Sequence, residues 1–188
     1  MPKYISHLNA ANFLPKANRI VVVGCSGGGK TTLAVDLAQR LGIEYQSLDR
    51  DVRWLPGWKQ RDTHTQRTMI AELVSQERWV IDGSGASTFD IRLPRTDLIL
   101  WVRVNRYTAL KGLATRVVKN LGTVRTEMAA GCPEKLPNVE FLSYIWHFEK
   151  KHAPKFIENI DKYGADVPVA VLKSHSEIAS MLKNAFEP

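Results

Sequence analysis

The 188-residue sequence has only two cysteines, Cys25 and Cys132, and neither belongs to a CxxC pair. Two isolated cysteines exclude a disulfide-stapled scaffold and favour a reducing compartment, so we expect a cytoplasmic protein. The five histidines lack the spacings typical of metal ligands, which argues against a structural zinc site. The N-terminal segment has no apolar stretch ahead of a small-residue cleavage site, which speaks against secretion.

Long hydrophobic runs are also missing. The longest apolar stretches, such as residues 20–23 and 98–102, fall far below the roughly 20 residues that a membrane-spanning helix needs. With 44% hydrophobic and 24% charged residues, the composition is that of a globular protein with a real core. We therefore expect no membrane partner and one domain over residues 19–188, preceded by an extension over residues 1–18.

Short apolar runs alternate with helical patterns along the chain. Strands are expected at residues 20–23, 44–48, 79–81, 97–102 and 167–172. Helices are expected at residues 33–41, 63–76, 88–93, 107–119, 139–163 (bent near Pro154) and 177–185. This alternation is typical of an α/β protein with three layers, in which helices cover both faces of a parallel sheet. Residues 121–137 have no clear period and are predicted to form a mobile loop.

A glycine-rich motif follows the first predicted strand and opens the first helix. The segment GCSGGGKTT fits the P-loop pattern GxxxxGK[ST], in which backbone N–H groups and a helix N-terminus surround phosphate groups. Lys30 would reach the β and γ phosphates, and the Thr31 hydroxyl would bind Mg²⁺. The residues predicted to hold a nucleotide are Gly24, Ser26, Gly27, Gly28, Gly29, Lys30, Thr31 and Thr32.

Acidic residues follow two other predicted strands, at the sheet edge where α/β proteins bind ligands. Asp82, in an Asp82-Gly83 pair, is either a Mg²⁺ ligand or a turn residue. Asp49 is either a catalytic base that accepts a proton from an attacking hydroxyl or a turn cap. Arg61 and Arg92 could bind an anionic acceptor, or form ordinary surface ion pairs.

Positive charge is concentrated in one region. The chain has 26 Lys+Arg against 19 Asp+Glu, a net charge of +7, and a pI near 9.5. No acidic residue lies between Asp97 and Glu127, whereas six basic residues do. We predict that residues 119–137 form a lid, and that Arg125 on it and Arg116 just before it neutralise a transferring phosphoryl group. A solvated helix face is the alternative for part of this charge.

The chain resembles the FlaR-type DNA topology modulation proteins, which are related to adenylate and shikimate kinases among the P-loop nucleotide kinases. The resemblance spans about residues 19–183 and includes the segments GCSGGGKTTLA, LDRDVRWLPGW, GCPEKL and YIWHF. It implies a five-stranded parallel sheet of order 2-3-1-4-5 with a lid over the nucleotide. It also implies that the loop of residues 173–175 borders the adenine, with Lys173 and Ser174 as nucleotide-binding residues. Asp49, Arg61, Asp82, Gly83 and Arg92 are implied to face a second site. The sequence departs from the family in two places: residues 84–87 lack the arginine that members often carry after the Asp-Gly pair, and Asn120 stands where an RxxxR lid pattern would place its second arginine.

These patterns favour an ATP-dependent kinase of adenylate kinase type, with Mg-ATP as phosphoryl donor and a small molecule, which could be a nucleotide, as acceptor. Lys30, Asp49, Arg116 and Arg125 are the predicted catalytic residues. Two alternatives stay open: a nucleotide-dependent DNA-binding regulatory protein, suggested by the pI, and a simple ATPase. The identity of the acceptor and the oligomeric state are left open by the sequence.

Overall fold

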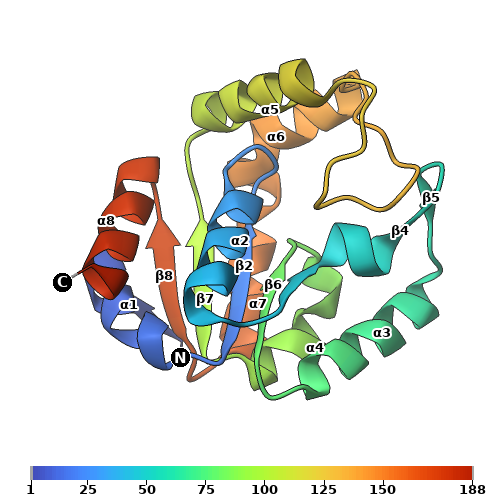
Figure 1. Cartoon of the computed structure of the whole chain (residues 1–188). Coiled ribbons are helices and arrows are strands. Elements are labelled where there is room, and N and C mark those ends of the chain that lie inside the picture. Colours follow the sequence, from blue (N-terminus) through green and yellow to red (C-terminus); the bar gives the residue numbers. More distant parts are fainter. Residues whose placement is uncertain (1, 188) are drawn as a thin grey trace.

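A six-stranded sheet forms the centre of the molecule, in a computed structural model that describes residues 2–187 (Figure 1). Its strands are β1 (Lys3–Ile5), β2 (Arg19–Gly24), β3 (Tyr45–Ser47), β6 (Trp79–Asp82), β7 (Leu98–Val102) and β8 (Pro168–Leu172). They run parallel in the order β1-β8-β7-β2-β6-β3. The predicted order 2-3-1-4-5 is confirmed as β3-β6-β2-β7-β8.

The predicted number of five strands is wrong, because β1 adds a sixth at the β8 edge. Lys3 pairs with Pro168 and Ile5 with Ala170. The helix that follows, α1 (His7–Phe13), packs against α8 (His175–Phe186) and buries Ala10 completely. Residues 1–18 were expected to lie ahead of the core, but those that the structure describes add an edge strand and a covering helix to it.

The central strands bring the functional segments to one edge of the sheet. Strand β7 and most of β2 are fully buried, as expected for a parallel sheet covered on both faces. In the register of the sheet, Gly24 lies beside Val102 and Val22 beside Asp82, while Asp82 also lies beside Ser47. The loops after β2, β3, β6 and β7 therefore meet at the carboxyl edge of the sheet.

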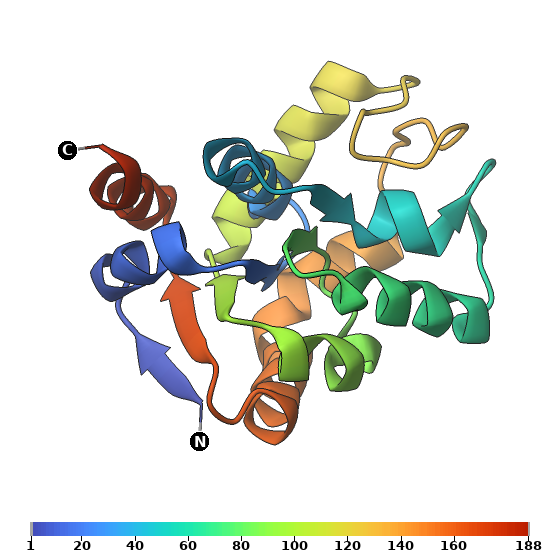
Figure 2. The ribbon, with the colours of Figure 1, turned by 60° about the horizontal axis from the view of Figure 1, so that its bottom comes forward.

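Helices cover both faces of the sheet (Figures 1 and 2). On one side lie α1, α2 (Lys30–Leu41) and α8, and on the other α3 (Thr63–Ser75), α4 (Phe89–Arg92) and α7 (Ala153–Tyr163). Helix α5 (Arg106–Asn120) crosses the carboxyl edge and packs on α6 (Val139–Lys151). The predicted bend falls at His152, ahead of Pro154 in the first turn of α7, where proline needs no N–H donor.

Two irregular segments complete the carboxyl edge. The first is a π-helical turn, Leu48–Arg53, followed by a small hairpin of β4 (Trp54–Leu55) and β5 (Lys59–Gln60). The second is the loop of residues 121–137 between α5 and α6, which lies beside the hairpin (Figure 1). Within residues 2–187, no helix is both long and apolar enough to cross a membrane.

Candidate functional site

The loop between β2 and α2 has the conformation that its glycines allow. Gly24, Gly27 and Gly29 have φ angles of 140°, 77° and 99°, which side-chain-bearing residues rarely adopt. Helix α2 starts at Lys30, and among its described residues neither a side-chain cap nor a first-turn acid occupies its N-terminus. The free N–H groups and the positive end of the helix dipole therefore point into an anion-binding loop.

Close packing holds this loop against β7 and α5. A Cβ atom on Gly24 would lie 2.0 Å from the Val102 carbonyl oxygen, and one on Gly27 would lie 2.2 Å from the Ala109 carbonyl oxygen. From the other side, a Cβ atom on Gly112 would lie 2.1 Å from the Gly27 carbonyl oxygen. Helix α5 thus rests directly on the loop, with backbone against backbone.

Two side chains from outside the glycine motif also hold the loop. The Ser84 hydroxyl accepts a hydrogen bond from Gly24 N at 3.0 Å and donates one to Gly24 O at 2.5 Å. His175 Nε2 lies 3.0 Å from Gly28 O, at the start of α8. Ser84 follows the Asp82-Gly83 pair directly, so its position was the available signal, whereas His175 comes from a distant strand-helix junction.

Lys30, Thr31 and Asp82 meet beneath the loop. Lys30 Nζ donates to Cys25 O at 3.0 Å, and the Thr31 hydroxyl donates to Asp82 Oδ2 at 2.5 Å. The second oxygen of Asp82, Oδ1, is buried and has no hydrogen-bond partner among the described residues. Burial raises the pKa of Asp82, although Lys30 and Thr31 oppose this shift. A buried carboxylate oxygen without a partner, beside a threonine hydroxyl, is a donor set that fits Mg²⁺.

The remaining predicted nucleotide residues are placed differently. The Thr32 side chain is exposed on α2, and Ser174 caps α8 by accepting from Glu177 N at 3.2 Å. Lys173 lines a cavity of about 520 Å³, which also reaches Cys25 of the loop. Ser174 is thus occupied as a helix cap, and a contact of Lys173 with the adenine stays a prediction.

The predicted lid arginines are brought together by an acid that the sequence reasoning did not assign. Arg116 Nε donates to Glu134 Oε1 at 3.0 Å, and Arg125 Nε donates to Glu134 Oε2 at 2.9 Å. Arg116 also donates to the Ser26 hydroxyl at 3.3 Å. Arg103, at the start of the basic stretch, pairs with Glu149 of α6. Acids from outside the stretch therefore balance part of its charge, so it is not simply a solvated basic face.

Arg92 does not have the surroundings of an anion clamp. Its side chain is completely buried and donates to Gly83 O at 2.9 Å, to Gly85 O at 2.8 Å and to the Thr88 hydroxyl at 3.1 Å. Burial lowers the pKa of Arg92 to about 9. The guanidinium instead fixes the turn after β6, because α4 packs inward and turns Arg92 beneath that turn. A Cβ atom on Gly83 would lie 2.7 Å from the Leu48 side chain, so this turn touches the π-helical turn.

Asp49 lies in the π-helical turn. Its carboxylate is half exposed and lies 3.7 Å from the Arg53 guanidinium. Tyr144 of α6 is within electrostatic reach of Asp49 and Arg53, and burial raises its pKa. Arg61 is partly exposed, and its Nε donates to Val52 O at 2.9 Å. The aromatic segment YIWHF was the available signal for Tyr144.

A glycine-rich phosphate-binding loop on a parallel sheet of this order defines a P-loop protein with a kinase-like fold. The chain belongs to the AAA domain family, whose model matches residues 20–120, more than half of the chain. A shikimate kinase from Thermobifida fusca (strain YX) is 25% identical over 166 residues, which cover 80% of this chain and 95% of that relative.

Solved structures show the same fold. A shikimate kinase from Acinetobacter baumannii in complex with shikimate has a TM-score of 0.55 and 17% identity, covering 92% of this chain and 95% of its own. The shikimate kinase from Bacteroides thetaiotaomicron has a TM-score of 0.54 and 19% identity, covering 92% of this chain and 99% of its own. The deoxyadenosine kinase from M. mycoides with bound dATP has a TM-score of 0.52 and 15% identity, covering 88% of this chain and 95% of its own. The chain therefore shares the P-loop kinase fold over nearly its whole length.

Proposed function

We propose that the chain is a phosphotransferase that moves the γ-phosphoryl group of ATP to a hydroxyl or phosphate oxygen of a small acceptor. The observation that carries the proposal is the convergence of three groups on one loop. These are the free N-terminus of α2, the Thr31–Asp82 pair and the Arg116 side chain on Ser26. A bare turn with an incidental lysine would need none of them.

In the proposed reaction, the acceptor oxygen forms a bond to the γ phosphorus while the bond from that phosphorus to the β–γ bridging oxygen breaks. The N–H groups of the loop and Lys30 bind the phosphates, and Thr31 and Asp82 are the proposed Mg²⁺ ligands. When bound, Mg²⁺ would supply positive charge that offsets the negative charge of the phosphates. Arg116 and Arg125 stabilise the charge of the transferring group, and Asp49 accepts the proton if the acceptor is a hydroxyl.

The acceptor side is proposed to lie between the π-helical turn and α6, with Asp49, Gly83 and Arg61 from the sequence prediction and Arg53 and Tyr144 from the structure. The printed names of the relatives suggest two acceptor classes to try first, hydroxy acids of the shikimate type and deoxynucleosides. The narrower assignments to the topology modulation proteins and to the adenylate kinase type, as well as a cytoplasmic location, stay predictions.

A panel of acceptors tests the proposal. Purified protein with Mg-ATP is incubated with shikimate, deoxynucleosides and nucleoside monophosphates, and ADP formation is followed. We expect acceptor-dependent ADP formation that is lost in Lys30→Ala. The proposal fails if no acceptor raises ADP formation above that of Lys30→Ala. ADP release that is independent of every acceptor would instead support a simple ATPase.

A further inference from the structure

Glu134, near the end of the predicted lid, is a buried carboxylate between two arginines. Its side chain is only 6% exposed, and each of its oxygens accepts from a different guanidinium, Arg116 at 2.9 Å and Arg125 at 2.9 Å. One negative charge therefore faces two positive charges, which leaves a net positive charge in the group. Because Arg116 also reaches Ser26 at 3.3 Å, this group adjoins the phosphate-binding loop.

The main chain of Glu134 fixes this side chain in place. Glu134 O accepts from Gly122 N at 3.0 Å, and Glu134 N donates to Thr123 O at 2.9 Å. These two bonds close the base of the loop just after α5 ends. With its backbone bonded on both sides and its carboxylate bonded at both oxygens, Glu134 has little freedom to change rotamer.

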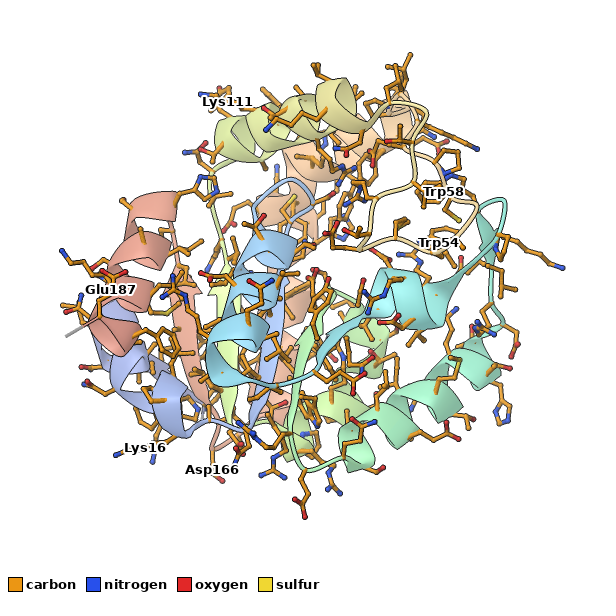
Figure 3. The ribbon with its side chains drawn as sticks, viewed as in Figure 1. Lys16, Trp54, Trp58, Lys111, Asp166 and Glu187 are labelled. Carbon is orange, nitrogen blue, oxygen red and sulfur yellow. The ribbon has the colours of Figure 1, made fainter. Side chains whose placement is uncertain are left out.

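The three residues before Glu134 are bonded to the hairpin of residues 54–60. Gly131 O accepts from Gly57 N at 2.9 Å, and Pro133 O accepts from Trp58 Nε1 at 3.0 Å. The Cys132 thiol accepts from Trp58 N at 3.3 Å and donates to Leu55 O at 3.2 Å. Trp54 and Trp58 also pack against buried Cys132, and Figure 3 shows the two rings next to each other beside the loop.

We propose that Glu134 is a positioning residue, which holds Arg116 and Arg125 at the phosphate-binding loop, and that residues 131–134 couple this position to the hairpin. The hairpin continues directly from the π-helical turn that carries Asp49. Movement of the π-helical turn is therefore transmitted through the hairpin and residues 131–134 to Arg116 and Arg125. This inference rests on the proposed function for its catalytic consequence, whereas the mechanical coupling stands on the contacts alone.

Kinetics of Glu134→Gln test the positioning role. The variant keeps the shape of the side chain but removes the charge that holds two guanidinium groups together. We expect kcat to fall by between about tenfold and about 100-fold, as for a catalytic group displaced by about 1 Å, with a smaller change in the KM for ATP. Glu140→Gln, which removes an exposed acid just after the loop, is the matched control and should behave as wild type.

A second background separates positioning from a general loss of structure. In protein that carries both Arg116→Gln and Arg125→Gln, adding Glu134→Gln should have no further effect on kcat, because the groups that it positions are already gone. An undiminished effect in that background, or a kcat of Glu134→Gln equal to that of Glu140→Gln, overturns the positioning role.

Hydrogen exchange tests the coupling without any need for turnover. Glu134→Gln should speed amide exchange both in residues 121–134 and in the hairpin of residues 54–60. Trp58→Phe removes the hydrogen bond to Pro133 from the hairpin side, and it should also speed exchange in both segments. Faster exchange in the mutated segment alone overturns the coupling. Wild-type protein without turnover on any acceptor would count against the proposed function and leave this result intact.

Discussion

Replacing Gly112 by alanine tests whether α5 must rest on the phosphate-binding loop. The new Cβ atom would lie 2.1 Å from the Gly27 carbonyl oxygen, whereas real Cβ contacts essentially never fall below 3.0 Å. The nearest atoms to this Cβ all belong to the Gly27 backbone, so no side chain can rotate away to make room. Helix α5 and the loop must therefore separate by about 1 Å, which is the difference between these two distances.

The expected cost is modest for stability and large for function. Overpacking of this kind destabilises by about 1–3 kcal/mol, and the helical preference of alanine over glycine returns about 1 kcal/mol. Arg116 lies one turn further along α5 and reaches Ser26 at 3.3 Å, so a shift of about 1 Å breaks that contact and should lower kcat/KM by about 100-fold.

The assays are thermal unfolding, binding of a non-hydrolysable ATP analogue and turnover. Thr115→Ala, on the exposed side of the same helix, is the control that changes helix propensity without touching the loop. It should be slightly more stable than wild type and equally active. If Gly112→Ala binds nucleotide and turns over like Thr115→Ala, the contact of α5 with the loop has no functional role.

Three further substitutions test the proposed Mg²⁺ ligand, a surface ion pair and a contact of the phosphate-binding loop. Asp82→Asn should raise the free energy of unfolding of the metal-free protein by about 1 kcal/mol, seen as a higher melting temperature, because burial opposes the charged carboxylate. The same substitution should abolish Mg²⁺-dependent turnover. Asp97→Asn should cost about 1 kcal/mol in urea denaturation at pH 7. Burial alone would raise the pKa of Asp97, but hydrogen bonds from Arg19 and the main chain outweigh it and hold this pKa below its ordinary value. That stabilisation is therefore present above the unfolded pKa of about 3.9 and is lost as the pH falls through the folded value, so the two proteins should converge in acid. Ser84→Ala should weaken nucleotide binding, measured by calorimetry, because it frees both backbone groups of Gly24.

The features that the sequence predicted well are those with local signals. The strand at residues 20–23 and the glycine motif after it combine continuous burial with a turn and a helix start, and the fold places them as expected. The alternation of strands and helices predicted a parallel sheet, whereas the order β3-β6-β2-β7-β8 was implied by the family resemblance. Strand β1 carries no such signal, because its three residues are exposed or half-buried and it is defined only by pairing with distant β8.

Side-chain partners across long separations were out of reach. Arg92 and Arg61 look alike in the sequence. The inward packing of α4 buries Arg92 completely, whereas Arg61, just after β5, is partly exposed. Likewise, the sequence pointed to Arg116 and Arg125 but did not show that Glu134 pairs with both of them. The predicted lid holds two acids, Glu127 and Glu134, and the sequence did not show which of them pairs with the arginines.

The proposed function requires that the γ-phosphoryl group leaves ATP for an acceptor other than water. Phosphorus NMR of Mg-ATP with the protein and each acceptor follows that group directly. The proposed function predicts a new phosphorylated-product resonance that grows with ADP for at least one acceptor and is absent with Lys30→Ala. Appearance of inorganic phosphate alone, at the same rate with every acceptor, would contradict it.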